Sequence, residues 1–235
     1  MNEEELWLYT LAKKNGIVIT DIQIRQLTQY KTLLLDWNTK INLVSRKNEG
    51  NIWKGHIALS LTMLFKIHFR NGMKVLDLGT GGGFPGIPLS IMLPECSFLL
   101  LDSTQKKINA VQSMIDALQL KNAKTVWGRA EELQKDPKLS RSFDAVVARS
   151  VSSLSNLIEW GGPFLKTFKG VNIENEKISL SVPSLVTFKG MEIEEEEREA
   201  KKEFPTVKLQ GVPLIYPGSE EFENLDKKLI IVTQQ

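Results

Sequence analysis

A glycine-rich turn after a short apolar strand constrains the fold of this chain more than any other feature. The stretch Lys74-Val-Leu-Asp-Leu-Gly-Thr-Gly-Gly-Gly-Phe-Pro-Gly86 predicts a buried strand over 74–78, then a turn, then the start of a helix. Four of the five residues from 79 to 83 are glycine, and glycine has no Cβ atom to keep a ligand away from the backbone. Free N–H groups at the start of the following helix face the same space, so the turn predicts a site for a nucleotide-like ligand.

Two classes of cofactor compete for this turn. A dinucleotide site requires Gly-x-Gly-x-x-Gly directly after the strand, and residues 81–86 match that string. The position of this string relative to the strand argues against a dinucleotide site. The first glycine after the strand is Gly79, and counted from Gly79 the third glycine of the motif is replaced by Phe84. The alternative pattern is acid-x-Gly-x-Gly-x-Gly, formed by Asp77, Gly79, Gly81 and Gly83, and it resembles motif I of the class I S-adenosylmethionine methyltransferases. The register therefore favours S-adenosylmethionine over NAD.

A second predicted strand, 97–102, ends in an acidic residue. An acid at the tip of this strand, Asp102, can accept hydrogen bonds from both hydroxyls of a ribose. Dinucleotides and S-adenosylmethionine share this requirement, so Asp102 supports a nucleoside ligand without choosing between them. Ser103 and Thr104 follow it directly and are expected beside the same ligand.

Composition limits the other kinds of chemistry. Cys96 is the only cysteine and His56 and His68 are the only histidines, so we expect neither an intramolecular disulfide nor a metal site. No apolar run approaches the roughly 20 residues that span a bilayer, and the acidic N-terminus lacks signal-peptide character. These features predict a cytoplasmic protein without a membrane partner.

The charges are unevenly distributed although the net charge is only +2. Residues 1–72 contain 10 Lys/Arg and 6 Asp/Glu (+4), and residues 104–149 contain 9 and 5 (+4). Residues 190–235 contain 6 and 11 (−5). The two basic segments suit a polyanionic partner on one side of the molecule, although a solvated surface has the same composition.

Periodicity divides the chain into two domains, a helical extension over 1–72 and an α/β domain over 73–235. Apolar residues at three- and four-residue steps predict helices over 3–15 and 21–44, and a third helix is expected over 52–68. Strands and helices then alternate, which predicts a mostly parallel sheet covered by helices on both faces. The expected elements are strands 74–78, 97–102, 123–127 and 143–148, and helices 86–93 and 104–120.

The pattern is less regular after residue 160. Residues 165–170 resemble a helix end, and the polar stretch 170–184 suits a loop or an extra hairpin. A strand is expected over 184–188 and an acidic, solvated helix over 191–204. Residues 207–214 and 228–232 are expected to form an antiparallel pair of strands at the sheet edge.

Five segments together resemble one family, the bacterial small-subunit ribosomal RNA guanine-N7 methyltransferases (RsmG or GidB). The loop at residues 78–89 is similar to that family's Gly-x-Pro-Gly-Ile-Pro loop, and residues 37–45 are similar to its Trp-Asn-x-x-x-Asn-Leu segment. Three shorter matches follow in the same order: Leu101-Asp-Ser103 with Lys106-Lys107, Arg129-Ala-Glu-Glu132, and Ala148-Arg-Ser150. The resemblance covers residues 5–160 and implies a class I, Rossmann-like, three-layer methyltransferase fold with an N-terminal helical extension.

The resemblance also implies an activity and its residues. The expected reaction is methyl transfer from S-adenosylmethionine to N7 of a guanosine in 16S ribosomal RNA, by a monomer acting on the RNA or on the small ribosomal subunit. Cofactor contacts are implied for Gly79, Phe84, Asp102, Ala130 and Glu131, the last two near the adenine. Arg149 is the expected catalytic residue, beside guanine or the cofactor, and RNA contacts are expected from His56, Lys106, Lys107 and Lys189.

Two departures from the family pattern keep other functions open. Leu59 stands where the family has a polar residue, and a longer stretch leads to Pro183 before the fifth strand. A cofactor-binding RNA-binding or ribosome-assembly factor of the same fold is therefore an alternative. A methyltransferase with a small-molecule or protein substrate is another, and an NAD enzyme is a more distant one.

Overall fold

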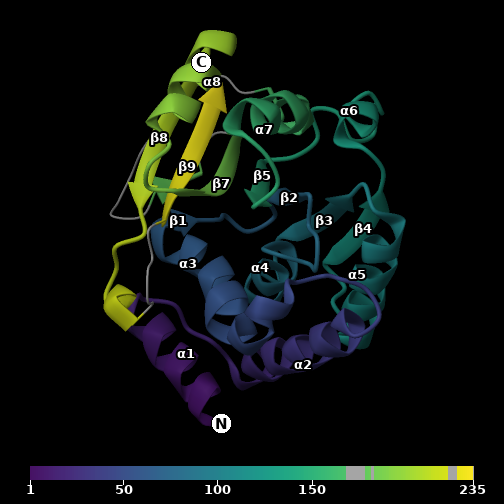
Figure 1. Ribbon diagram of the computed structural model, residues 1–235, viewed down its shortest axis with the longest axis vertical. Coiled ribbons are helices and arrows are strands. Elements are labelled where there is room, and N and C mark those ends of the chain that lie inside the picture. Colours follow the sequence, from purple (N-terminus) through teal and green to yellow (C-terminus); the bar gives the residue numbers. More distant parts are fainter. Residues whose placement is uncertain (168–177, 181–182, 222–226, 235) are drawn as a thin grey trace.

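The fold is built on a seven-stranded sheet, seen in a computed structural model that describes residues 1–167, 178–180, 183–221 and 227–234. The strand order across the sheet is β4-β3-β2-β5-β7-β9-β8 (Figure 1). In chain order the strands are β2 (Lys74–Leu78), β3 (Ser97–Asp102), β4 (Ala123–Trp127), β5 (Ala145–Arg149), β7 (Ser184–Gly190), β8 (Val207–Pro213) and β9 (Lys227–Gln234). A separate two-residue pair joins β1 (Ile67–His68) to β6 (Ile178–Ser179).

Six strands of the sheet run in one direction and one strand, β9, runs against them. Five of the six are adjacent and pair in parallel: β4, β3, β2, β5 and β7. Strand β9 is antiparallel to both β7 and β8, which confirms the expected antiparallel pair at the edge. The carboxyl ends of β2, β3 and β5 meet at one edge of the sheet, where ligands bind in folds of this class.

Helices cover both faces of the sheet and make three layers (Figure 1). One face carries α1 (Glu3–Lys14), α2 (Asp21–Asn38), α3 (Leu59–Lys66), α4 (Gly86–Met92) and α5 (Gln105–Ala117). The other carries α6 (Ala130–Leu133), α7 (Leu154–Gly161) and α8 (Glu194–Glu203). Each face of the sheet has its own hydrophobic core: the first core lies under α1 to α5 and the second under α6 to α8. Because neighbouring residues of a strand point to opposite faces, Val75 packs in the first core and Leu76 in the second.

The helices of residues 1–72 share the first core with the sheet. That core extends without a break from Leu8 in α1 to Ile231 in β9. Three glutamines on one face of α2 also donate hydrogen bonds to carbonyl oxygens at the ends of other helices. Gln23 bonds to Ile91 O at 3.0 Å beside the end of α4, and Gln26 and Gln29 bond to the last turn of α5. These carbonyls have no partner inside their own helices, so α2 is fastened to α4 and α5.

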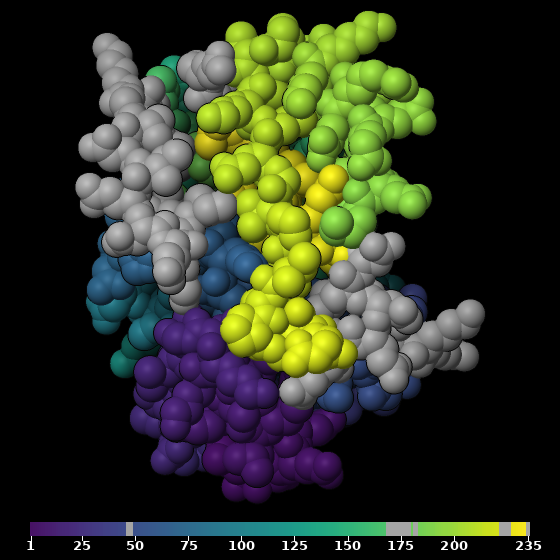
Figure 2. All heavy atoms as spheres, turned by 90° about the vertical axis from the view of Figure 1, so that its left-hand side faces the viewer, coloured from purple at the N-terminus to yellow at the C-terminus, as the bar shows by residue number. Residues whose placement is uncertain are grey.

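The chain also returns to the N-terminal helices after β8. Figure 2 shows this segment, in yellow, lying directly against the purple N-terminal atoms. The ring of Tyr216 packs edge-on against Phe65 with centroids 5.0 Å apart, and Asn15 donates a hydrogen bond to Pro217 O at 3.0 Å. These contacts tie the last part of the sheet to the first helices.

Two N-terminal helices differ from the expectation. The helix expected over 21–44 ends at Asn38, because the Asn38 side chain accepts hydrogen bonds from the N–H groups of Leu43 and Val44 and holds a tight turn there. The helix expected over 52–68 consists of a π-helix, η2 (Trp53–Ala58), followed by α3, and its last two residues form β1.

The expectations after residue 160 were partly wrong. Helical structure ends earlier than expected: α7 is followed by a short 3-10 turn, η3 (Gly162–Phe164), and Leu165, which caps that turn, pairs with Phe143 in an isolated parallel bridge. Residues 168–170 and most of 170–184 lie outside the described residues. The strand over 184–188 and the acidic helix over 191–204 are confirmed as β7 and α8. Among the described helices, none has the length and apolar character needed to cross a membrane.

Candidate functional site

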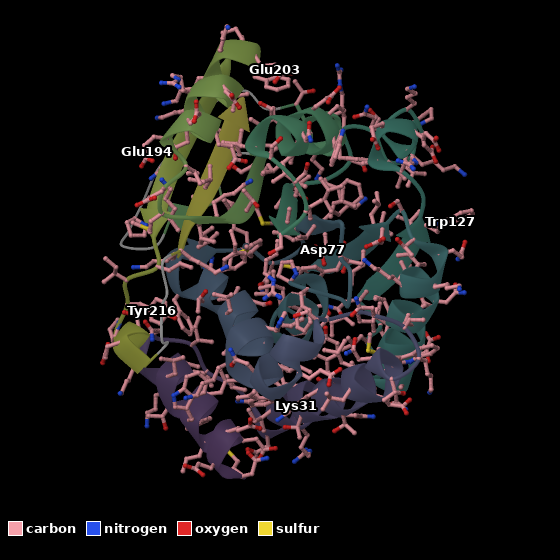
Figure 3. The ribbon with its side chains drawn as sticks, in the orientation of Figure 1. Lys31, Asp77, Trp127, Glu194, Glu203 and Tyr216 are labelled. Carbon is pink, nitrogen blue, oxygen red and sulfur yellow. The ribbon has the colours of Figure 1, made fainter. Side chains whose placement is uncertain are left out.

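A pocket of about 470 Å³ opens at the carboxyl ends of β2, β3 and β5. Its walls come from the glycine loop, from the ends of β3 and β5, and from the N-terminal segment before η2. Figure 3 places Asp77, which lies directly beneath the loop, near the centre of the molecule. The lining residues are Leu43, Val44, Ser45, His56, Gly79, Thr80, Gly81, Gly82, Phe84, Asp102, Ser103, Thr104, Lys107, Arg149, Ser150 and Val151.

Asp77 organises the glycine loop from below. Its Oδ2 accepts hydrogen bonds from the Thr80 hydroxyl at 2.6 Å and from the Gly86 N–H at 2.8 Å, so one oxygen spans the loop. A Cβ atom at Gly86 would lie 2.5 Å from that oxygen, which explains the glycine there. Burial raises the pKa of the Asp77 carboxyl to about 7, against the opposing effect of these two hydrogen bonds. The other oxygen, Oδ1, is buried without a hydrogen-bond partner among the described residues.

Gly81 forms the open side of the loop. Its φ of +58° lies in the left-handed region, and a Cβ atom there would point into open space with only Gly79 O at 4.0 Å. Since Gly81 lines the pocket, any side chain at this position would occupy the ligand's space. Gly83 has a different environment: a Cβ there would lie 2.6 Å from Ile87 and 3.0 Å from the Tyr30 hydroxyl, and Gly83 is absent from the described pocket lining.

Asp102 lies opposite the loop at the end of β3. Its Oδ2 accepts a hydrogen bond from Gly81 N at 3.0 Å, and its Oδ1 accepts one from Thr104 N at 2.8 Å. The carboxylate therefore links the loop that follows β2 to the segment that follows β3, and it lines the pocket. Ser103 and Thr104 line the pocket beside it, as the sequence predicts.

A second, smaller pocket of about 120 Å³ continues from the first. The two share Gly79, Ser103 and Val151, and the smaller one is also lined by Ala130 and Glu131. Val151 packs directly on Gly79, where a Cβ atom would approach its side chain to 2.7 Å. The site is therefore bipartite and has the residues expected near an adenine in its second part.

Arg149 lies on the other side of the main pocket in a stack with two rings. Its guanidinium carbon is 4.8 Å from the centre of the Phe84 ring, and the His56 and Phe84 ring centres are 5.0 Å apart. The guanidinium donates to the carbonyl oxygens of Gly55 and His56, and it contacts His56 Nδ1. Burial and the charge of Arg149 lower the pKa of His56 to about 4, so His56 is neutral near pH 7 and Nδ1 accepts.

The wall at Leu43, Val44 and Ser45 was not predicted. Asn38 holds this segment by accepting the N–H groups of Leu43 at 2.8 Å and Val44 at 2.9 Å. The Trp-Asn motif at residues 37–38 was visible in the sequence, but nothing in the sequence places the segment that it holds beside the glycine loop.

The three lysines expected at the RNA lie in different surroundings. Lys107 lines the main pocket, and Lys106 is exposed on the first turn of α5. Lys189 is only 12% exposed, since its ammonium pairs with Glu196 at 2.5 Å and donates to Ser152 O at 2.8 Å. The structure therefore brings Lys107 to the site and engages Lys189 with α8 and the loop after β5.

The pocket fits S-adenosylmethionine in shape and in polar groups. The side-chain-free face at Gly81 forms a cradle, and Asp102 offers acceptors for a ribose. The buried oxygen of Asp77 that lacks a partner suits a nearby cationic group. Over the described part of the chain, no group of three or more His, Cys, Asp or Glu side chains is placed to hold a metal ion.

Comparisons with known proteins agree with this site. The family model described as rRNA small subunit methyltransferase G matches residues 23–173. The enzyme of that name from Chlorobium phaeobacteroides is 45% identical over 175 residues, covering 72% of this chain and 77% of its own. The one from Clostridium novyi is 36% identical over 231 residues, covering 92% and 95%.

A solved structure shows the same fold at low sequence identity. Fibrillarin from Aeropyrum pernix, in complex with natively bound S-adenosyl-L-methionine, superposes with a TM-score of 0.51 at 13% identity, covering 70% of this chain and 67% of that one. The strand order, the glycine loop and the matching relatives lead to one assignment. The chain belongs to the ribosomal RNA small subunit methyltransferase G (GidB) family, and its fold is that of the class I S-adenosylmethionine-dependent methyltransferases.

Proposed function

We propose that this protein transfers the methyl group of S-adenosylmethionine to N7 of a guanosine in 16S ribosomal RNA. The observation that carries the proposal is the bipartite pocket, with the glycine loop and Asp102 on one side and Arg149 on the other, in a chain of this family. When bound, the cofactor supplies an activated methyl group on a positively charged sulfur.

The chemistry requires alignment more than proton transfer. Guanine N7 carries a lone pair in the ring plane and no proton, so no general base is needed to activate it. The enzyme lowers the barrier by holding nucleophile and methyl group in line and by excluding water. His56 is a half-buried neutral imidazole bonded to Arg149, so its proposed task is to hold the Arg149 side chain in position and not to transfer a proton.

Each part of the site has a proposed task. Asp102 accepts the ribose hydroxyls, and Ala130 and Glu131 border the adenine in the smaller pocket. Gly79 and Gly81 let the ligand approach the loop backbone. Arg149 binds the cofactor's carboxylate, because a partly buried guanidinium held by two carbonyl oxygens retains N–H donors for an anion.

The substrate base must leave its stack to reach this pocket. An unpaired or flipped guanosine suits a pocket that residues 43–45 help to line. We assign the helical segment 1–72 the task of holding the RNA beside the α/β domain, 73–235, because both supply walls of one pocket. The protein is proposed to work as a monomer in the cytoplasm.

The alternative of an inactive assembly factor receives little support from Leu59. That side chain is 6% exposed and belongs to the first core, so an apolar residue suits its position. Its difference from the family pattern leaves the pocket lining unchanged, since Leu59 does not belong to that lining among the described residues.

The test is an assay with purified protein, methyl-labelled S-adenosylmethionine and small ribosomal subunits from cells that lack the gene. We expect one labelled 7-methylguanosine in the 16S RNA after digestion. Labelling of a protein or a small molecule in a cell extract, without labelling of RNA, would support the non-RNA methyltransferase. Cofactor binding by calorimetry without any labelling would support the assembly factor.

A further inference from the structure

The strand register brings Lys227, which the sequence did not single out, to the same sheet edge and the same face as Arg149. Arg149 is the register partner of Phe188, and Phe188 is the partner of Leu229. Partners in adjacent strands point to the same face, and Lys227 lies two residues before Leu229, so its side chain leaves the sheet on the face of Arg149. Strand β9 starts at Lys227 opposite Gly190, the last residue of β7, which places Lys227 at the ligand-binding edge.

The lysines on the two faces of this sheet edge differ in their ion pairs. On the α8 face, Lys189 pairs with Glu196 at 2.5 Å and Lys228 pairs with Glu197 at 3.2 Å. On the pocket face, neither Lys227 nor Arg149 forms an ion pair with any carboxylate in the described part of the chain. Among the described residues, the fold thus pairs the lysines of one face with carboxylates and leaves Lys227 and Arg149 on the other face without such a partner.

The groups around Lys227 strengthen this contrast. Lys227 is half-buried, and desolvation followed by the charge of Arg149 lowers its pKa. Its charge also contributes to lowering the pKa of His56, after burial and the charge of Arg149. The carboxyl that faces Arg149, Asp77, is fully buried and its hydrogen bonds go to the glycine loop. Two cations that have no carboxylate partner in the described ranges, held on one face at reduced solvation, favour an anionic ligand.

We propose that Lys227 binds a phosphate group of the RNA backbone next to the target guanosine, on the side of the pocket away from the glycine loop. This inference rests on the proposed function, because the anion is taken to be RNA. The position suits the substrate and not the cofactor. The residues proposed to bind the cofactor lie at the ends of β2, β3, β4 and β5, whereas Lys227 lies on β9, two strands beyond Arg149 in the sheet order.

The experiment compares Lys227→Gln and Lys227→Arg with wild type. Binding to small ribosomal subunits from cells lacking the gene is measured between 50 and 200 mM salt, and S-adenosylhomocysteine affinity is measured by calorimetry. We expect Lys227→Gln to weaken subunit binding about 5-fold at low salt and to reduce the salt slope by about 0.7 to 0.9, the loss of one phosphate contact. Lys227→Arg keeps the charge and should stay within about 2-fold of wild type.

Two lysine variants serve as controls. Lys208→Gln removes the same charge from an exposed position on β8, and Lys228→Gln removes it from the neighbouring residue on the opposite face. Both should keep the wild-type salt slope, and melting curves for all variants show whether the fold is intact. The arginine variant keeps the test valid if Lys227→Gln is unstable, since a phosphate contact predicts rescue by Arg.

Three outcomes would overturn the assignment of Lys227. These are a wild-type slope for Lys227→Gln, an equal loss of slope for Lys208→Gln, or a parallel loss of S-adenosylhomocysteine affinity. The last would make Lys227 a cofactor residue. Failure of the proposed function is separate: wild-type protein would then bind or methylate no small-subunit RNA, whatever Lys227 does.

Discussion

The hydroxyl of Tyr30 donates a hydrogen bond to the carbonyl oxygen of Gly82 over 2.8 Å. This bond joins α2 to the glycine loop, and Tyr30 is completely buried where it forms. The same ring packs against Phe84 with centroids 5.4 Å apart, and a Cβ at Gly82 would meet Leu34 of α2 at 3.1 Å. The N-terminal helices are therefore part of the cofactor site's construction.

Tyr30→Phe is expected to remove the hydrogen bond that holds the glycine loop, while the phenyl ring still fills its place in the core. Loss of the hydroxyl leaves the buried Gly82 carbonyl without this donor, which costs about 1–2 kcal/mol of unfolding free energy. S-adenosylhomocysteine affinity should fall about 5-fold in calorimetry, because the loop that forms the cradle is less well held. The control is Tyr9→Phe in α1, which lies outside the described pocket lining and should leave cofactor affinity unchanged. Equal affinities for wild type and Tyr30→Phe would contradict this role.

Gly81→Asp is expected to abolish cofactor binding while the protein still folds. Aspartate and asparagine tolerate the left-handed region better than most residues, and the new side chain meets open space. An aspartate there would fill the pocket and place a negative charge beside Asp102. We expect more than about a 100-fold loss of S-adenosylhomocysteine affinity.

Gly81→Asn is the matched control, because it has nearly the same shape without the charge. It should lose affinity through volume alone and bind more tightly than Gly81→Asp. Normal cofactor binding by the aspartate variant would show that the ligand lies elsewhere.

Asp77 should make the ligand-free protein less stable as the pH rises. Its pKa is about 7 in the folded protein against an ordinary value of 3.8, so folding favours the protonated form. The stability that Asp77 contributes is complete below about pH 4 and is lost as the pH rises through 7, by at most about 1.4 kcal/mol per pH unit. Urea unfolding of wild type and Asp77→Asn across this range should show the difference shifting in favour of Asn with rising pH. A constant difference would contradict the raised pKa.

His56 should have the opposite effect on the acid side. Its pKa is lowered from 6.5 to about 4, so folding favours the neutral ring. The stability that depends on it is present above about pH 6.5 and is lost as the pH falls through 4, again by at most about 1.4 kcal/mol per unit. His56→Gln should therefore be relatively more stable at pH 4.5 than at pH 7 in the same unfolding assay. Because the Asp77 effect overlaps in this range, only the difference between variant and wild type is diagnostic.

The sequence was sufficient for the parts of the site that are local in the chain. The spacing of Asp77, near the end of β2, from Gly79 and Gly81 after it identified the loop, and Asp102 at the tip of β3 followed from the same strand pattern. These features were predictable because strand, turn and helix are adjacent in the chain. The glycines also mark where the turn needs a backbone without a Cβ atom. The final antiparallel strands were also predictable from their apolar pattern.

Contacts between distant segments were not predictable in the same way. The strands predicted over 184–188 and 228–232 stop short of Lys189 and Lys227, and only the observed register of β7 and β9 places these two lysines on opposite faces. The pairing of Lys189 with Glu196 depends on how α8 folds back over the sheet. Likewise, the motif at residues 37–38 gave no sign that Asn38 ends α2 and holds a wall of the pocket.

The central claim is tested most directly by mass spectrometry of nucleosides from 16S ribosomal RNA. RNA from cells with the gene, from cells without it, and from cells complemented with wild type or with Gly81→Asp should be digested and compared. We predict one 7-methylguanosine per 16S molecule with the wild-type gene, its loss without the gene, and no restoration by Gly81→Asp. An unchanged amount of 7-methylguanosine in cells without the gene would contradict the assignment of this protein as the methyltransferase for that base.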